Sequence, residues 1–292
     1  NNGFKSAWSS FQVTNLDTIK LLSKAILSDN KLITANPTLT TSSNDTNDAS
    51  GLYASTATNT GNPTYYFRGN VENNYVSFAG FIWRIVRINE DGTVRLIMQE
   101  GINNNTNYQF NSNYNNYTYM YYSNSNAKTI LENWYQTNIG SKADLAKNVA
   151  SGNYYCEQAK VKYSSDYTSE NTNMTLYSSY MPDFKCTTDG NGKGQVSASI
   201  GLLSYDEVVY AGGFSFVNND NYYLFSSNNT MWTMSPAGYA FGISAIWFIN
   251  TTGSVTNPSV SYTSALHPAI NLKDDTKISS GNGTKNNPYL LP

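Results

Sequence analysis

The chain has 292 residues, of which 39% are hydrophobic and 14% aromatic, so it can bury a substantial core in one large domain or two ordinary ones. Only 13% of the residues are charged, and 18 Lys and Arg nearly balance 20 Asp and Glu. The sequence has no dense basic stripe, which excludes nucleic-acid binding. It also has no run of about 20 apolar residues, which excludes a membrane span.

The polar surface must be built from Asn, Ser, Thr and Tyr, because charged residues are scarce. Such neutral polar surfaces are typical of secreted and cell-surface proteins, although codon bias in an AT-rich genome would give a similar composition. Residue 1 is Asn and not Met. We therefore expect a processed or trimmed N-terminus from which any anchor has been removed.

The N-terminal part, residues 1–50, is expected to hold one helix and a polar linker. An amphipathic helix is predicted over residues 15–28 because apolar residues recur on one stripe. These residues are Leu16, Ile19, Leu22 and Ile26. Residues 35–63 are rich in Thr, Ser, Asn, Asp and Gly, which indicates a linker or an extended surface segment. The main domain is then expected over residues 51–292.

Strand and helix signals follow one another along this domain. Strands are predicted over 64–69, 75–79, 81–88 and 93–99, with a turn at 89–92. Residues 103–126 are low in complexity and cannot form a core by themselves. Helices are predicted over 127–138 and 143–149, and Ser204 and Glu207 form a capping box that starts another helix, which Gly212 ends. Further strands are expected over 241–249, 254–263 and 265–272.

Helices lie between strand pairs without alternating one by one with single strands. This order predicts an α+β fold with a mainly antiparallel sheet and a few short helices. The core is expected to form around six apolar residues spread over these segments. They are Trp83, Leu96, Trp134, Leu202, Trp232 and Ile270.

The chain has two cysteines, Cys156 and Cys186. A bridge between them would close a polar, Tyr-rich loop and indicate an oxidising, extracellular setting. The alternative is two free thiols in a cytosolic protein. Two Cys and one His do not supply a tetrahedral metal set, so no metal site and no cofactor are expected.

The sequence contains few candidate catalytic residues. The single histidine, His267, lies in a closing strand and is expected to be structural. Asp206 and Glu207 are adjacent at a helix start, so their side chains should diverge and not act as an acid–base pair. Asp274 and Asp275 fit a solvated turn. The chain is therefore not expected to be an enzyme.

Aromatic side chains among amides and hydroxyls offer a different kind of site, because Tyr, Asn and Ser are the residues that adaptable binding surfaces use. One loop is especially rich in Tyr: Tyr108, Tyr114, Tyr117, Tyr119, Tyr121 and Tyr122. At least one aromatic cluster is expected to be an exposed recognition patch. The alternative is that these rings pack on the sheet.

Several motifs together resemble a group of uncharacterised surface-exposed proteins of Firmicutes and related low-GC bacteria. The matching segments are Tyr65–Gly69, Tyr75–Ile97, Gly201–Gly213, Trp232–Pro236, His267–Leu272 and Gly281–Thr284 with Pro288 and Tyr289. Those proteins are in turn distantly similar to the C-type-lectin-like fold of bacterial variable adhesion proteins and formylglycine-generating enzymes. The resemblance covers roughly residues 51–292.

The resemblance implies a ligand face on the hairpin that precedes the final strand. By position it nominates six ligand-binding residues: Tyr239, Phe241, Ser244, Trp247, Asn250 and Tyr262. His267 and Met234 stand where Arg is usual in the family, which puts a family-type ion pair there in doubt. The calcium signatures of animal lectins and the closely spaced copper-binding cysteines of formylglycine-generating enzymes are both absent from the sequence.

These observations predict an extracellular bacterial surface protein that works in adhesion or ligand recognition. Its partner would be a glycan or protein of a host or neighbouring cell, with self-assembly as a further option. The first alternative is a structural subunit of a surface filament or pilus, which an exposed apolar stripe on the 15–28 helix would favour. The second alternative is an unidentified enzyme.

Overall fold

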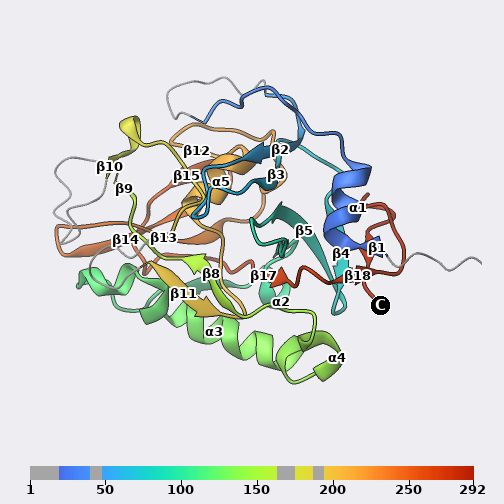
Figure 1. Ribbon diagram of the computed structural model, residues 1–292. Coiled ribbons are helices and arrows are strands. Elements are labelled where there is room, and N and C mark those ends of the chain that lie inside the picture. Colours follow the sequence, from blue (N-terminus) through green and yellow to red (C-terminus); the bar gives the residue numbers. More distant parts are fainter. Residues whose placement is uncertain (1–19, 40–47, 163–174, 187–193) are drawn as a thin grey trace, which may run out of the picture.

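The computed structural model describes residues 20–39, 48–162, 175–186 and 194–292. Two large β-sheets dominate these residues, and short helices lie around them (Figure 1). Most strand pairs are antiparallel, so the expected α+β class with a mainly antiparallel sheet is confirmed. No helix in the described ranges is long and apolar enough to cross a membrane.

The first sheet has the strand order β17-β6-β5-β3-β2, and β4 joins it by pairing with both β5 and β19. Its strands are β2 (Gly51–Ser55), β3 (Thr64–Arg68), β4 (Tyr75–Phe78), β5 (Phe81–Ile88), β6 (Val94–Met98), β17 (Ala269–Leu272) and β19 (Tyr289–Leu290). The β5–β6 hairpin forms because Asp91 accepts two hydrogen bonds from Thr93 and Gly92 adopts a φ of 87°.

The second sheet has the order β12-β15-β14-β13-β16-β7. Its strands are β7 (Asn107–Gln109), β12 (Phe214–Ser215), β13 (Met231–Ala240), β14 (Ile243–Ile249), β15 (Ser254–Thr256) and β16 (Thr263–Ala265). Three two-stranded pairs complete the β structure. They join β1 (Lys20–Leu21) to β18 (Lys277–Ile278), β8 (Gly152–Cys156) to β11 (Gln195–Ala198), and β9 (Val161–Lys162) to β10 (Thr175–Leu176).

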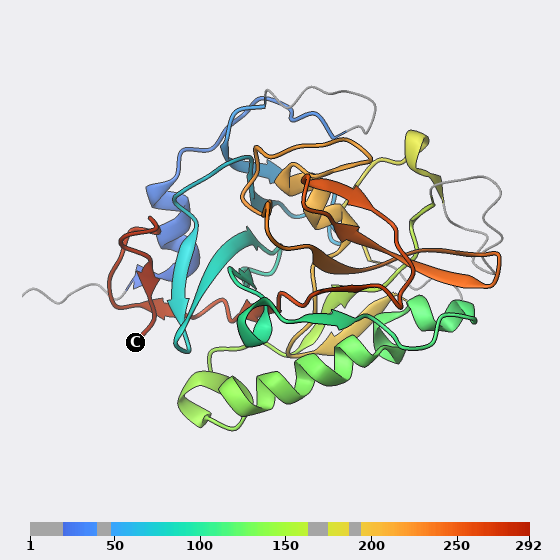
Figure 2. The same ribbon diagram turned by 180° about the vertical axis from the view of Figure 1, so that it is seen from behind.

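The helices are short. The α-helices are α1 (Leu22–Asp29), α2 (Ile102–Asn105), α3 (Asn126–Tyr135), α4 (Ala143–Ala146) and α5 (Tyr205–Ala211). A π-helical turn, η3 (Gln136–Gly140), continues α3, and three 3-10 turns are η1 (Tyr117–Met120), η2 (Tyr122–Asn124) and η4 (Tyr177–Ser179). The helical run from α3 to α4 covers one side of the molecule (Figure 2).

Sequence signals place two of these helices correctly. Ser125 caps α3 by accepting a hydrogen bond from the Lys128 amide. The capping box of α5 is present as predicted, since Ser204 and Glu207 each satisfy the other's backbone amide. Gly212 ends α5 with a φ of 121°, a conformation that strains other residues.

All six predicted core residues are buried in one continuous hydrophobic cluster, so that prediction is confirmed. The cluster extends from α1 through both sheets to α3 and α5. The Tyr-rich loop also contributes, because Met120, Tyr121 and Tyr122 are almost fully buried. Two of the six tyrosines named for this loop, Tyr121 and Tyr122, are therefore buried in the core, and Tyr114 is exposed.

The predicted helix over 15–28 begins later than expected. Residues 15–19 lie outside the described residues, and Lys20 and Leu21 form a strand that pairs with Lys277 and Ile278. Helix α1 then runs from Leu22, and its apolar side chains Leu22, Ala25 and Ile26 are buried in the common core. A pairing partner more than 250 residues away in the chain outweighs the local helical pattern.

The expected linker over 35–63 contains a strand. Residues 51–55 form β2, which pairs antiparallel with β3 along its whole length. The Gly, Ala and Ser of this strand carry little β propensity, so its partner and not its own sequence makes it a strand. Residues 40–47 of the predicted linker lie outside the described residues.

Strand β13 was missed because Pro236 stands in its interior. Proline is tolerated there since the pairing with β14 shifts register on both sides of it, between Trp232 and Pro236 and again between Pro236 and Gly238. The strand predicted over 241–249 accordingly starts at Ile243, and Phe241 and Gly242 form a hairpin turn. Pro268 separates β16 from β17 within the predicted strand 265–272.

We predict that Trp232→Ala lowers the free energy of unfolding by about 3–5 kcal/mol, because the indole is buried against Phe110 and Phe248 and donates a hydrogen bond to the Tyr108 carbonyl. Chemical denaturation of the purified chain measures the change. Phe241→Ala is the matched control, since Phe241 is 95% exposed and its truncation should leave stability nearly unchanged. A Trp232→Ala variant as stable as this control would contradict the prediction.

Candidate functional site

The β13–β14 hairpin extends from one end of the molecule, opposite to α1 (Figures 1 and 2). Its turn is formed by Phe241 and Gly242, both in left-handed backbone conformations with φ of 53° and 76°. A positive φ is strained for a phenylalanine. The turn leaves the Phe241 side chain 95% exposed, and Ile243 beside it is also exposed.

The Tyr-rich loop lies against this hairpin and adds to its surface. The Ser244 amide donates a 2.7 Å hydrogen bond to the Tyr114 carbonyl, and the Ser244 hydroxyl donates to the Asn116 carbonyl. The Tyr239 hydroxyl donates to the Asn115 carbonyl at 3.0 Å. These bonds hold Tyr114 beside the hairpin with 47% of its side chain exposed.

Tyr262 lies farther from the turn, next to the opposite end of β14. It is 53% exposed and packs edge-on against Phe248 of β14, with ring centroids 5.8 Å apart. We call the five side chains of this group the hairpin surface: Tyr114, Tyr239, Phe241, Ile243 and Tyr262. They come from three segments of the chain, and exposed aromatic and apolar side chains along one region are typical of recognition surfaces.

Three of the six nominated ligand-binding residues, Tyr239, Phe241 and Tyr262, belong to the hairpin surface. The other three lie elsewhere. Ser244 is fully buried under the Tyr-rich loop, and Trp247 is fully buried against Tyr205 and Phe216. Asn250 lies at the far end of β14, where its side chain accepts hydrogen bonds from Thr252 and Ser254 and closes a turn.

Trp247 and Ser244 face inward because a strand sends successive side chains to opposite faces, and both sides of β14 between Ser244 and Ile249 are covered. Sequence reasoning missed Ile243 and treated Tyr114 as part of a separate loop. The exposed-aromatic signal was present at Tyr114, but only the hydrogen bonds from Ser244 bring that loop to the hairpin.

The hairpin surface carries no charge of its own. Residues 101–127 and 221–272, from which all five of its side chains come, contain no Asp, Glu, Lys or Arg. A partner of this surface would therefore be recognised by ring contacts and by neutral hydrogen bonds from amides and hydroxyls, and not by charge.

A second candidate site is a polar cavity of about 330 Å³ beside the disulfide. Cys156 and Cys186 are bonded to each other, with Cα atoms 5.7 Å apart, so the predicted bridge is confirmed. Acidic and basic side chains from four separate segments line the cavity. The most buried of them are Arg87, Arg95, Lys160, Asp206 and Glu207.

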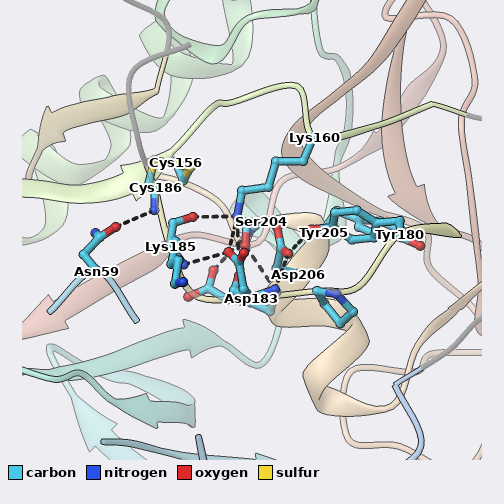
Figure 3. A network of polar contacts seen from close by, with 12 residues as sticks. Asn59, Cys156, Lys160, Tyr180, Asp183, Lys185, Cys186, Ser204, Tyr205 and Asp206 are labelled. Atoms are coloured by element: carbon cyan, nitrogen blue, oxygen red, sulfur yellow. Dashed lines mark hydrogen bonds and ion pairs between the residues drawn. A yellow bond between two sulfur atoms is a disulfide. The ribbon is translucent and has the colours of Figure 1, made fainter. Parts of the chain in front are cut away.

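Lys160 connects the disulfide-bonded segment to α5 (Figure 3). Its Nζ lies 2.8 Å from the Asp183 carboxylate and 3.4 Å from that of Asp206. Asp206 also accepts hydrogen bonds from the Tyr180 hydroxyl and the Asp183 amide. Burial alone would lower the pKa of Lys160, but the two carboxylates outweigh it and raise that pKa. Burial raises the pKa of Asp206, and the Lys160 ammonium opposes the rise.

Glu207 lies on the other side of the same cavity. One of its oxygens is 3.1 Å from Arg87 Nε and 2.9 Å from Arg95 Nε, and the other accepts a hydrogen bond from the Ser204 amide. Burial would raise the pKa of Glu207, but the attraction of Arg95 and then of Arg87 is stronger and lowers it. The two adjacent carboxylates thus diverge to different partners, as the sequence analysis expected.

The buried acidic and basic side chains around this cavity form ion pairs with one another, which indicates a structural role. The disulfide attaches residues 175–186 to β8, and the Lys160 contacts with Asp183 and Asp206 attach them to α5. Among the residues that the structure describes, no group of His, Cys, Asp and Glu is placed to hold a metal ion. Asp274 and Asp275 are exposed and lie in a turn. The hairpin surface is therefore the stronger candidate for recognition.

Comparison of the chain with protein-family models, curated proteins and solved structures finds no match.

We predict that Glu207→Gln lowers the free energy of unfolding at neutral pH by about 3–5 kcal/mol, because two buried arginines lose their shared carboxylate. The pKa of Glu207 is lower in the folded chain than the ordinary 4.5. Its contribution is thus present above pH 4.5 and is lost as the pH falls through the folded pKa. Denaturation curves between neutral and acid pH should show a smaller acid-induced loss of stability in the variant.

Asp144→Asn is the matched control for this prediction. It also replaces an ion-paired carboxylate by an amide, but Asp144 is 98% exposed next to Lys147, so the effect should be close to zero. Equal stability loss in the two variants, or none in either, would show that the buried ion pairs of Glu207 do not matter.

We further predict that Cys156→Ser with Cys186→Ser destabilises the chain by about 3–4 kcal/mol, because the bridge closes a loop between residues 30 apart in sequence. Non-reducing peptide mapping of native material should find the two cysteine peptides linked, and thermal melting with and without reductant measures the effect. Free thiols at both positions in native material would contradict this prediction.

Proposed function

We propose that this chain is an extracellular surface protein that works in adhesion, and that its hairpin surface binds a neutral glycan of a host or neighbouring cell. One observation carries the proposal. An uncharged hairpin presents Phe241 to solvent with Tyr114 held beside it by a hydrogen bond from Ser244, and Tyr262 is exposed next to Phe248 of the same hairpin. Aromatic faces next to amide and hydroxyl groups suit the apolar faces and the hydroxyl groups of sugars.

Two further features support an extracellular setting. The disulfide is of the kind that persists in oxidising compartments. The low charged fraction, 13%, gives a surface of Asn, Ser, Thr and Tyr. We also propose that residues 51–292 have the C-type-lectin-like fold and belong with the Firmicutes-type surface proteins that their motifs resemble.

The filament alternative depended on an exposed apolar stripe in the first helix. In the described part of that helix, Leu22, Ala25 and Ile26 are fully buried in the core. This described part of the stripe therefore serves the fold of the chain and gives no support to self-assembly. Binding is also favoured over catalysis, because the charged groups of the cavity beside the disulfide already pair with one another.

The test is a glycan array probed with the purified chain and with its Phe241→Ala and Tyr262→Ala variants. We expect each substitution to weaken binding to the recognised glycan about tenfold, the effect of losing roughly 1.4 kcal/mol of contact. The melting temperature should stay nearly unchanged, because both side chains are more than half exposed.

Leu290→Ala is the matched control, since Leu290 is also exposed but lies on β19, away from the hairpin. Normal binding by both hairpin variants would refute the assignment of the site. If no glycan binds and a screen against cell-surface proteins finds a ligand whose binding needs Phe241, the partner is a protein.

A further inference from the structure

A second cavity, of about 350 Å³, lies apart from both the hairpin surface and the disulfide. Its wall is formed by β5 and β6 of the first sheet, by residues 223–231 and by His267 just before β17. None of the five residues of the hairpin surface lines it. The side chains that matter are Arg84, Tyr223 and His267, each of which is less than 9% exposed.

Arg84 is a buried cation held in a fixed position. Its guanidinium donates to the Asn74 side chain at 2.7 Å, to the Gln99 side chain at 3.1 Å and to the Val71 carbonyl at 2.6 Å. It also lies 4.0 Å and 5.2 Å from the ring centres of Tyr75 and Tyr223. A guanidinium has five N–H groups, so these three bonds leave it further donors.

The charge of Arg84 differs from that of the other buried arginines in lacking a counter-ion. Arg68 pairs with Asp48, and Arg87 and Arg95 share Glu207. Among the residues that the structure describes, no carboxylate forms an ion pair with Arg84. Glu72, which is exposed, attracts it only at longer range. Buried charges are normally paired, because an uncompensated one is costly.

Two of the residues that line this cavity, Tyr223 and His267, each have a buried polar atom without a partner among the described residues. Within the described ranges, neither the Tyr223 hydroxyl nor His267 Nε2 has a hydrogen-bond partner. His267 Nδ1 lies 3.2 Å from the Met98 carbonyl, which can only accept, so the ring proton is on Nδ1 and Nε2 is an acceptor. Burial lowers the pKa of His267 and keeps it neutral, and burial raises the pKa of Tyr223 and keeps its hydroxyl protonated.

The cavity thus presents a cation, a hydroxyl donor and a neutral acceptor. From this set we infer that it binds a small carboxylate that also carries a hydroxyl group, a class that includes the sugar acids. The ligand carboxylate accepts hydrogen bonds from Arg84 and the Tyr223 hydroxyl, and it supplies the missing counter-ion. The ligand hydroxyl donates to His267 Nε2.

Glu100 also lines this cavity, and its side chain is exposed. It accepts a hydrogen bond from the Asn105 side chain at 2.5 Å. Its charge disfavours ligands with a second carboxylate near it, so a monocarboxylate fits better than a dicarboxylate. The walls supplied by Leu224 and Met231 are apolar and suit the carbon skeleton of the ligand.

Isothermal titration of the purified chain with D-glucuronate tests the inference, with D-glucose as the neutral counterpart of similar shape. We expect glucuronate to bind and glucose to bind at least tenfold more weakly, because only glucuronate neutralises Arg84. Equal affinity for the two sugars would overturn the role of Arg84, and no binding of glucuronate would overturn the site.

The Tyr223→Phe variant locates the site. It removes a hydroxyl that has no partner in the described residues, so the melting temperature should not fall. The affinity for glucuronate should drop about tenfold. The matched control is Tyr262→Phe, which removes an exposed hydroxyl from the hairpin surface and should bind glucuronate normally.

A second variant, His267→Leu, removes the acceptor and should also weaken glucuronate binding while glucose stays weak. Unchanged affinity in both Tyr223→Phe and His267→Leu would place glucuronate somewhere else on the chain. The hairpin surface is untouched by these variants, so glycan-array binding through Phe241 can succeed or fail independently of this cavity.

Discussion

The carboxylate of Glu207 is the interaction on which the rest of the structure depends. It closes the capping box that begins α5, and it forms ion pairs with both Arg87 of β5 and Arg95 of β6. One buried group thereby connects the start of a helix to the hairpin of the first sheet. Without it, two buried guanidinium groups lack a counter-ion, which costs more than an ion pair contributes.

The position of α5 then determines what surrounds it. Asp206, next to Glu207, turns to the opposite side and receives Lys160 and Tyr180, which attach the disulfide-bonded segment. Tyr205 packs against Trp247 of β14, with ring centres 4.9 Å apart. The base of the β13–β14 hairpin is therefore packed against α5, although its turn projects into solvent. Packing of this kind lowers the entropy that an exposed surface loses when it binds a partner.

The two proposed sites use opposite chemistry in one chain. The hairpin surface is uncharged and exposed. It would recognise a large partner by its shape and by its hydroxyl groups. The cavity at Arg84 is partly open and holds a buried cation with which no carboxylate of the described residues forms an ion pair. Arg84 differs in this respect from Arg68, Arg87 and Arg95, which all form ion pairs with carboxylates of the fold.

The sequence by itself determined the features that depend on neighbouring residues. The turn at Asn89–Gly92, the capping box at Ser204 and the apolar core positions follow from local backbone and packing preferences. Exposed aromatics such as Phe241 were also recognisable. Only the tertiary structure decided that β13 tolerates Pro236, that Trp247 faces inward, that Tyr114 joins the hairpin and that Arg84 forms no ion pair with a carboxylate of the described residues. These depend on contacts between residues far apart in the chain, which no local pattern records.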